Sequence, residues 1–279
     1  MVRTMRDWTG RDGTVRGDVR GARHGRSPTV GDVAQNIYDD PAFFAAYSQL
    51  PRSVEGLAGA AEWSSLAALL PDLTGLRVVD LGCGFGWFCR WAVERGATSV
   101  HGIDLSTAML ARAIRETEAA GLTGQITYER QDLDALDLPA ASFDLAFSSL
   151  TLHYLTGLDR LLATVSAALV PGARFVCSVE HPLFTAPSAP AFVAGPGGHP
   201  VWPTDRYLDE GPRTTDWLAT GVVKQHRTIG TYVTAFVAAG FELTDLVEWG
   251  PSGEQIARVP EWSLERERPP FLLLAARRR

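Results

Sequence analysis

The sequence contains almost no lysine and has more acidic than basic residues, which argues against binding to nucleic acid. Lysine occurs only at position 224, and the formal net charge of the 279 residues is −6. Affinity for a phosphate backbone comes mainly from clustered lysine and arginine side chains. We therefore expect no nucleic-acid partner.

Cysteine is scarce and long apolar runs are missing, which argues against a disulfide-stabilised protein and against a membrane-spanning or secreted one. The three cysteines are an odd number within apolar segments, as expected of buried thiols in a reducing cytoplasm; they are Cys83, Cys89 and Cys177. No stretch approaches the roughly 20 apolar residues that span a bilayer, and the first residues lack the apolar run of a signal peptide. The sequence predicts a soluble cytoplasmic protein without a membrane partner, as a monomer or homodimer.

The composition is that of a globular domain with additional segments. Hydrophobic residues make up 46% and charged residues 21% of the chain, so a sizeable core can form. Residues 1–30 are rich in arginine and poor in apolar residues, which predicts a disordered tail. An RNA-binding arm is the alternative, and the interleaved aspartates weaken it. Residues 31–74 predict a helical cap with two short helices, from Asn36 to Leu50 and from Leu57 to Leu70.

Residues 75–279 alternate between strand and helix patterns, which is typical of an α/β fold. Near-continuous apolar strands separated by helices indicate a doubly wound, mostly parallel, seven-stranded sheet that is covered on both faces. The strands are expected at 77–81, 99–104, 126–130, 143–148, 173–179, 241–249 and 271–275, and the main helices at 87–94, 107–120, 158–169 and 228–239. A Pro/Gly-rich insertion at 182–226 follows the fifth strand and is expected to form a lid.

The turn after the first strand carries three glycines at alternate positions, Gly82, Gly84 and Gly86. Glycine permits a tight turn and a close approach of backbone N–H groups to a ligand, although a simple packing turn is the alternative. Asp80 closes this strand, and Asp104 closes the next strand 24 positions later, where its carboxylate can accept hydrogen bonds from a ribose diol. This pattern predicts an adenosine-type ligand. Position 87, where a dinucleotide fingerprint needs glycine, is occupied by tryptophan, which disfavours NAD.

With these motifs the chain resembles the class I S-adenosylmethionine-dependent methyltransferase superfamily, over residues 75 to 180. The matching segments, in the family's order, are Val78-Val79-Asp80-Leu81-Gly82-Cys83-Gly84-Phe85-Gly86, Gly102-Ile103-Asp104-Leu105-Ser106 with Met109, Arg130-Gln131-Asp132-Leu133, Phe143-Asp144-Leu145-Ala146-Phe147-Ser148, Leu152-His153-Tyr154 and Leu169-Val170-Pro171-Gly172-Ala173. The resemblance implies a Rossmann-like methyltransferase fold.

The resemblance also implies a cofactor site for S-adenosylmethionine, with S-adenosylhomocysteine as product and no metal. Asp80, Gly82 and Ser148 would lie near the methionine part, Asp104 would hold the ribose, and Asp132 would face the adenine amine. The remaining cofactor-binding residues by the same motifs are Gly84, Gly86, Leu105, Met109 and Leu133. Because the sulfonium is already an activated methyl donor, positioning of the acceptor should dominate catalysis.

The family places the substrate between the N-terminal helices and the insertion, and both segments are rich in aromatic residues here. They favour a small, apolar or aromatic metabolite, although the same side chains could instead pack a small core under the lid. The candidate substrate-binding residues are Tyr38, Tyr47, Arg52, Phe184, Trp202, Tyr207 and Arg227. Arg52 could bind a carboxylate, of the cofactor or of the substrate, or could simply be exposed.

Four residues are candidates for a general base: His153, Glu180, His181 and His226. Histidine suits the role because its ordinary pKa is about 6.5, yet each histidine could equally be structural. Transfer to oxygen, nitrogen or carbon is left open. An RNA or protein methyltransferase, an NAD-type oxidoreductase and a non-catalytic nucleotide-binding module are the alternatives. The segment Ser148-Ser149-Leu150-Thr151 lacks the Asn/Asp-Pro-Pro-Tyr/Phe motif of methyltransferases that act on nucleotide bases or glutamine.

Overall fold

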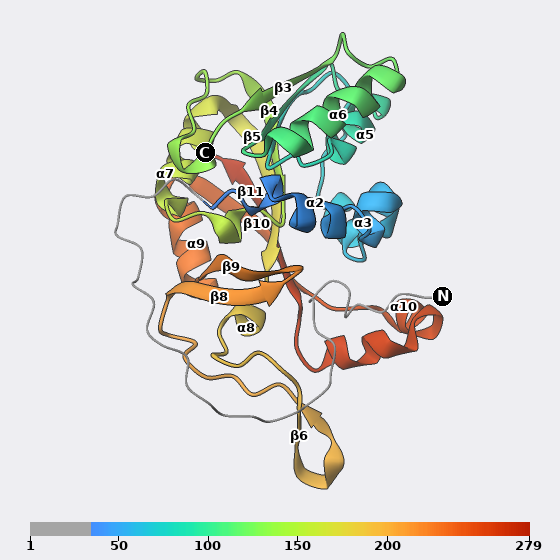
Figure 1. Ribbon diagram of the computed structural model, residues 1–279. Helices are drawn as coiled ribbons and strands as arrows, with labels where there is room; N and C mark the ends of the chain where they lie inside the picture. The colour runs from blue at the N-terminus through green and yellow to red at the C-terminus, as the bar shows by residue number, and fades with distance from the viewer. Residues whose placement is uncertain (1–34) are drawn as a thin grey trace.

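The central element is a seven-stranded sheet whose strand order is β10-β11-β5-β4-β1-β2-β3 (Figure 1). The computed structural model describes residues 35–279, so the tail expected at 1–30 lies outside the described residues. The strands are β1 (Arg77–Leu81), β2 (Ser99–Asp104), β3 (Ile126–Arg130), β4 (Phe143–Ser149), β5 (Leu169–Glu180), β10 (Phe241–Trp249) and β11 (Phe271–Arg278).

Strands β1 to β5 run parallel, and β11 is antiparallel to both β5 and β10. Strand order reverses at β1, which lies between β4 and β2. The carboxyl ends of β1, β2, β4 and β5 therefore meet at one edge of the sheet, where ligands bind in open α/β sheets. The doubly wound, mostly parallel fold is confirmed. The first four strands match their predicted bounds within a residue, whereas β5 and β11 are longer than expected.

Two hydrophobic cores cover the two faces of the sheet. Val78 packs with helices α5 (Trp87–Glu94) and α6 (Thr107–Ala119), and the next residue, Val79, packs on the other face with α7 (Leu158–Ala168) and α9 (Ile229–Ala238). Successive side chains of a strand point to opposite faces. A strand buried on both sides must then be apolar at nearly every position, as the sequence pattern indicated.

The N-terminal segment is more broken than the two predicted helices. It contains η1 (Ile37–Asp39), α2 (Pro41–Tyr47), α3 (Pro51–Val54), η2 (Gly56–Gly59) and α4 (Trp63–Ala67). Pro51 starts a new helix because proline fits the first helical turn but cannot continue a preceding helix. Gly56 then adopts a φ of +64° beside the Trp87 ring, which ends α3. The prediction of two helices was wrong because it followed apolar spacing across these breaks.

The insertion at 182–226 contains regular structure that its proline and glycine content did not predict. It forms α8 (Pro182–Thr185), the short strands β6 (Val193–Ala194) and β7 (Pro200–Val201) with η5 (Pro196–Gly198) between them, and an antiparallel hairpin of β8 (Gly211–Trp217) and β9 (Ala219–His226). In β9 alternate residues are buried, namely Val222, Lys224 and His226. The hairpin, orange in Figure 1, packs against α2 through Trp217 and Phe43.

A helical stretch between the last two strands was also missed. It comprises α10 (Gly253–Arg258) and η6 (Pro260–Arg266). Ser252 and Gln255 form a reciprocal capping box at the start of α10, which is a recognisable local signal for a helix N-terminus.

Candidate functional site

The three glycines of the first turn have different structural roles. All three adopt positive φ angles, +79° at Gly82, +52° at Gly84 and +70° at Gly86. A Cβ atom on Gly82 would lie 2.2 Å from Thr151 Oγ1, and one on Gly86 would lie 2.1 Å from Tyr128 Oη. A Cβ on Gly84 would meet no atom within 4 Å. Two glycines are thus required by packing, and Gly84 borders open space that a ligand can enter.

Asp104 holds this turn from the end of β2. Its Oδ2 accepts a hydrogen bond from Gly84 N at 2.8 Å, and its Oδ1 accepts one from Ser106 N at 2.9 Å. A carboxylate has about four acceptor positions, so two remain for other donors such as ribose hydroxyls. Burial raises the pKa of Asp104, although these N–H groups oppose the shift.

Asp39, which was not predicted, fastens the N-terminal segment beside Asp104. It accepts hydrogen bonds from Ser106 Oγ at 2.5 Å and from Ala108 N at 3.0 Å, at the N-terminus of α6. Burial alone would raise its pKa, but these hydrogen bonds outweigh burial and hold the pKa below its ordinary value. An aspartate in a short 3-10 helix gives no sequence signal for a distant helix N-terminus, so only the tertiary structure identifies this contact.

The other predicted cofactor residues lie below or beside the turn. Asp80 is buried and accepts a hydrogen bond from Cys89 Sγ at 3.2 Å, and burial raises its pKa to about 7. Ser148 is fully buried and its hydroxyl donates to Leu81 O at 2.8 Å. Asp132 accepts from Asp134 N at 2.9 Å and caps the 3-10 helix η3 (Leu133–Ala135).

Leu133 and Met109 are buried, and the carbonyl of Leu105 accepts from Arg130 Nε at 2.9 Å. The structure thus brings the predicted cofactor residues to the carboxyl edge of β1 to β4. Asp80 and Ser148 lie beneath the turn, where their side chains join β1 to its neighbours.

An aromatic cluster connects the glycine turn to the hairpin of the insertion. It consists of Tyr38, Phe43, Tyr47, Tyr154 and Trp217. Tyr38 Oη donates to Tyr154 Oη at 3.2 Å, and the rings of Tyr38 and Tyr47 lie 5.3 Å apart. Trp217 contacts Phe43 at 5.6 Å and Tyr47 at 6.2 Å. Tyr47 also contacts Phe85 of the turn, with ring centroids 5.7 Å apart. Tyr154 was not predicted to contact the substrate, whereas Trp217 is one of the aromatic residues of the insertion that were expected to line the lid.

A buried ion pair lies next to this cluster. Lys224 Nζ is 2.5 Å from Glu180 Oε1, and the exposed fractions of the two side chains are 4% and 13%. Burial alone would raise the pKa of Glu180, but the charge of Lys224 and its hydrogen bond hold the pKa below its ordinary value. Glu180 Oε2 and Trp217 Nε1 are buried without a hydrogen-bond partner. Lys224 was missed as a site residue, although its being the only lysine is a visible signal.

The three candidate histidines are all buried. His153 Nδ1 accepts a hydrogen bond from Glu180 N at 3.3 Å, and burial lowers the His153 pKa to about 3. His181 uses both ring nitrogens, accepting from Leu183 N at 3.0 Å and contacting Glu248 Oε1 at 3.0 Å, and burial lowers its pKa to about 4.

His226 is likewise held on both sides, by Thr185 Oγ1 at 2.8 Å and by Tyr207 O at 2.9 Å. Burial lowers its pKa. At neutral pH the shifted values favour the uncharged imidazole at all three positions. Hydrogen bonds to the protein already occupy the ring nitrogens of His181 and His226.

The remaining predicted substrate residues are dispersed. Phe184 and Trp202 stack with ring centroids 5.8 Å apart in a small core around the Arg268 guanidinium, which lies 4.5 Å and 4.4 Å from the two rings. Arg52 pairs with the buried Glu62 at 2.7 Å. The structure therefore groups Tyr38 and Tyr47 with the ion pair but places Phe184 and Trp202 in a separate cluster.

Tyr207 and Arg227 also contact protein groups. Tyr207 Oη accepts from Ile229 N at 3.3 Å, and Arg227 Nη2 donates to Leu155 O. Both residues help to attach the hairpin to the main domain, since Tyr207 precedes β8 and Arg227 follows β9.

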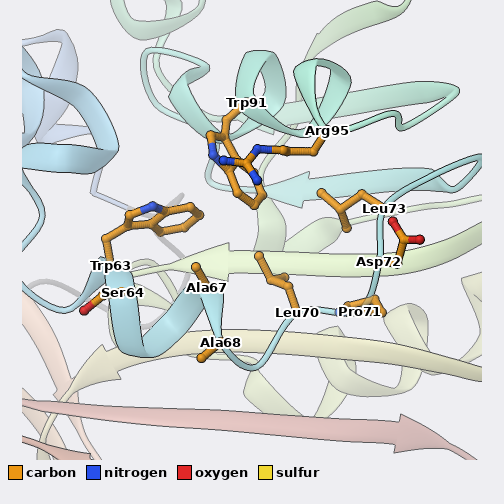
Figure 2. A pocket seen from close by; sticks show the side chains of 10 residues that line it. All are labelled: Trp63, Ser64, Ala67, Ala68, Leu70, Pro71, Asp72, Leu73, Trp91 and Arg95. Carbon is orange, nitrogen blue, oxygen red and sulfur yellow. The ribbon is translucent and has the colours of Figure 1, made fainter.

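A separate pocket of 490 Å³ lies between α4 and the C-terminal end of α5 (Figure 2). Trp63, Trp91 and Arg95 line it together with Asp72, which precedes β1. It is therefore at the amino edge of the sheet, away from the glycine turn. Within residues 35–279 no cluster of three or more His, Cys, Asp or Glu side chains could hold a metal ion. In the same range, no helix combines the length and the apolar character needed to traverse a bilayer.

Comparisons with known proteins agree with this geometry. The family model described as a methyltransferase domain matches residues 78–172. A crystal structure of an S-adenosylmethionine-dependent methyltransferase from Mesorhizobium loti is 56% identical, covers 80% of this chain and 100% of that chain, and superposes with a TM-score of 0.76. A Listeria monocytogenes protein assigned to the same class is 37% identical, with 79% and 99% coverage and a TM-score of 0.71.

Among curated proteins, an uncharacterized protein of Haemophilus influenzae is 30% identical over 251 residues, which is 87% of this chain and 97% of that protein. Relatives whose names state an activity match over about half of their length or less. The Penicillium fellutanum methyltransferase phqN, for example, is 25% identical over 51% of its length.

Proposed function

Because the chain belongs to the class I S-adenosylmethionine-dependent methyltransferases, we propose that it methylates a small metabolite bound beneath the hairpin of the insertion. The observation that carries the proposal is the aromatic cluster, which contacts Phe85 of the glycine turn through Tyr47 and includes Trp217 of the hairpin. Such a wall suits an acceptor with an apolar or aromatic body.

The residues at the turn fit S-adenosylmethionine, which supplies an activated methyl group when bound. The open space at Gly84 and the two spare acceptor positions of Asp104 suit a ribose that approaches the backbone closely. Asp132, which follows β3 at the same edge of the sheet, would accept a hydrogen bond from the adenine amine. We expect no metal in this chemistry.

Two features favour a small acceptor over a macromolecule: α2 and the hairpin cover the site, and the protein has a negative net charge. Segments far apart in sequence, α2 and the hairpin β8–β9, meet over the carboxyl edge of the sheet, and a covered site favours a small acceptor over a polymer. The net charge of −6 disfavours RNA. The trans-aconitate 2-methyltransferase of Deinococcus radiodurans, 36% identical over 42% of its length, illustrates a small-molecule acceptor in a related protein.

In the proposed reaction the protein positions the acceptor and excludes water. Tyr38, Tyr47 and Trp217 would hold the body of the acceptor against the turn, so that its nucleophilic atom lies in line with the methyl group. The hairpin β8–β9 and α2, packed over the acceptor, would keep competing water away.

The test is methyl transfer from radiolabelled S-adenosylmethionine to fractionated extract of the source cells. We expect label in the small-molecule filtrate, and much less label in a reaction with the Asp104→Ala variant at the same cofactor concentration. Label that enters RNA or protein instead would overturn the choice of a small acceptor. Failure to bind S-adenosylhomocysteine in calorimetry, or binding of NAD, would overturn the proposed cofactor.

A further inference from the structure

The ion pair between Glu180 and Lys224 narrows the chemistry of the acceptor, an inference that rests on the function proposed above. We propose that the pair binds a hydroxyl group, so that the enzyme is an O-methyltransferase of an uncharged alcohol or phenol. The pair presents a hydrogen-bond acceptor and hydrogen-bond donors side by side. A hydroxyl both donates and accepts at a single atom and can therefore engage both partners.

The pair lies where an acceptor has to be. Glu180 is the last residue of β5, which is separated from β1 by β4 alone. Strands are spaced by about 4.8 Å, so Glu180 is roughly 10 Å across the sheet from the glycine turn. Lys224 Nζ lies 4.8 Å from the Trp217 ring and 5.9 Å from the Tyr154 ring. The aromatic cluster thus borders the pair on the side toward the turn.

Both members of the pair have unused hydrogen-bonding capacity. Glu180 Oε2 is buried and has no partner, whereas Oε1 receives the lysine. The ammonium group has three N–H donors, and one of them is directed at Glu180. Buried polar atoms are nearly always satisfied in folded proteins. An exception beside an aromatic wall at the carboxyl edge of the sheet indicates a position that a ligand completes.

The choice of lysine supports a ligand site more than a purely structural pair. Every other basic residue apart from histidine is arginine, including those in the buried pairs of Arg52 and Arg268. A guanidinium tends to occupy both oxygens of a carboxylate in a bidentate arrangement, whereas an ammonium is a compact point charge. An arginine at position 224 has the geometry to contact both oxygens of Glu180, whereas Lys224 contacts Oε1 alone.

The charges of the pair argue against a charged acceptor. Because the charges of Glu180 and Lys224 largely cancel, the repulsion of an acceptor carboxylate by Glu180, or of an acceptor ammonium by Lys224, offsets its attraction to the other member of the pair. Bringing an additional unpaired charge into this buried position carries a desolvation cost. A neutral hydroxyl avoids this cost and still satisfies Oε2.

The same contacts give the proton a destination. The acceptor oxygen forms a bond to the methyl carbon as the carbon–sulfur bond of S-adenosylmethionine breaks, and the electron pair of that bond stays on sulfur. The hydroxyl proton passes to Glu180 Oε2, and the Lys224 ammonium donates to the acceptor oxygen while negative charge develops on it. Glu180 then releases the proton to water, which restores the pair.

The test uses four probes that share one ring and differ in the head group. Phenol, aniline, benzoate and benzylammonium are titrated into the full chain loaded with S-adenosylhomocysteine, and binding is followed by ligand-observed NMR. We expect phenol to bind most tightly, with dissociation constants for the other three probes at least about tenfold higher. A tenfold difference corresponds to the loss of about one hydrogen bond to a charged group. Tighter binding of any other probe, or no binding of phenol, would overturn the proposal. Loss of S-adenosylhomocysteine binding would instead refute the proposed function.

Two variants separate recognition from folding. Lys224→Arg keeps the charge but is expected to cover Oε2, so phenol affinity should fall at least about tenfold while the melting temperature changes little. The double variant Glu180→Gln with Lys224→Met removes both charges together, which a fold often tolerates, and should also lose phenol preference. Both should bind S-adenosylhomocysteine as the wild type does. Unchanged phenol binding in Lys224→Arg would show that the pair is structural.

Discussion

Replacing Asp104 by alanine should weaken binding of S-adenosylhomocysteine without unfolding the protein. In the structure this carboxylate accepts hydrogen bonds from Gly84 N and Ser106 N at 2.8 and 2.9 Å. Two acceptor positions are left for the ribose diol. The substitution therefore removes the ribose contacts and also releases Gly84 from its place in the turn.

The size of the effect follows from the number of contacts. A hydrogen bond to a charged group contributes about 1.5–3 kcal/mol, so losing one ribose contact should raise the dissociation constant at least about tenfold. Losing both contacts should raise it about a hundredfold or more. Asp104→Asn is the isosteric counterpart. Its NH2 group must face either Gly84 N–H or Ser106 N–H, so it should also bind more weakly than the wild type.

Calorimetry with S-adenosylhomocysteine measures the effect, and Asp144→Ala provides a matched control. Asp144 also accepts hydrogen bonds from a backbone N–H and a side chain, both of Arg77, but at the amino end of β4. Asp144→Ala should bind S-adenosylhomocysteine with the affinity of the wild type. If a folded Asp104→Ala variant also has a dissociation constant within twofold of the wild type, the assignment of Asp104 to the ribose is refuted.

Three further predictions concern the turn and the strand beneath it. Gly84 and Gly172 both have positive φ angles and open space where a Cβ would lie, so alanine at either position should cost about 1–2 kcal/mol of unfolding free energy. In calorimetry only Gly84→Ala should weaken S-adenosylhomocysteine binding. Equal affinities of the two variants would contradict a ligand at Gly84. In urea unfolding, Gly86→Ala should lower the unfolding free energy more than Gly84→Ala does, because the new Cβ would lie 2.1 Å from Tyr128 Oη, which is hydrogen-bonded to Thr117. Equal losses of unfolding free energy in the two variants would contradict the packing role of Gly86. Burial raises the pKa of Asp80 to about 7, above its value in the unfolded chain, so the Asp80 carboxyl group stabilises the fold at low pH and this stabilisation is lost as pH rises through about 7. The unfolding free energy of Asp80→Asn minus that of the wild type should therefore increase by up to about 1.4 kcal/mol per pH unit between pH 4 and 7. A free-energy difference that does not change with pH would show that the carboxyl group is not buried in its protonated form.

The sheet could be predicted from the sequence because each strand carries its own signal. A strand buried on both faces needs apolar residues at almost every position, as in Arg77–Leu81, and the following glycines mark its end. Local chemistry of this kind also singled out Asp104, which lies beside the glycine turn in the structure. By contrast, the hairpin β8–β9 was missed because the turn between its strands, at Leu218, contains no glycine or proline.

The acceptor side of the site depends on contacts between distant segments, which local patterns do not contain. Tyr38 and Tyr154 meet across 116 positions, and Glu180 and Lys224 meet across 44. Aromatic residues in the insertion looked alike in the sequence. Only the fold distinguishes Trp217, which borders the ion pair, from Trp202, whose indole donates to Leu183 O beside Arg268.

The contact between Asp39 and Ser106 has a consequence for the order of events in turnover. The short helix that carries Asp39 closes the edge beside Asp104, and its neighbour Tyr38 belongs to the wall for the acceptor. One segment thus borders both binding positions. We therefore expect a compulsory sequence in which the methyl donor enters first, the segment docks, and the acceptor binds to the surface that docking completes.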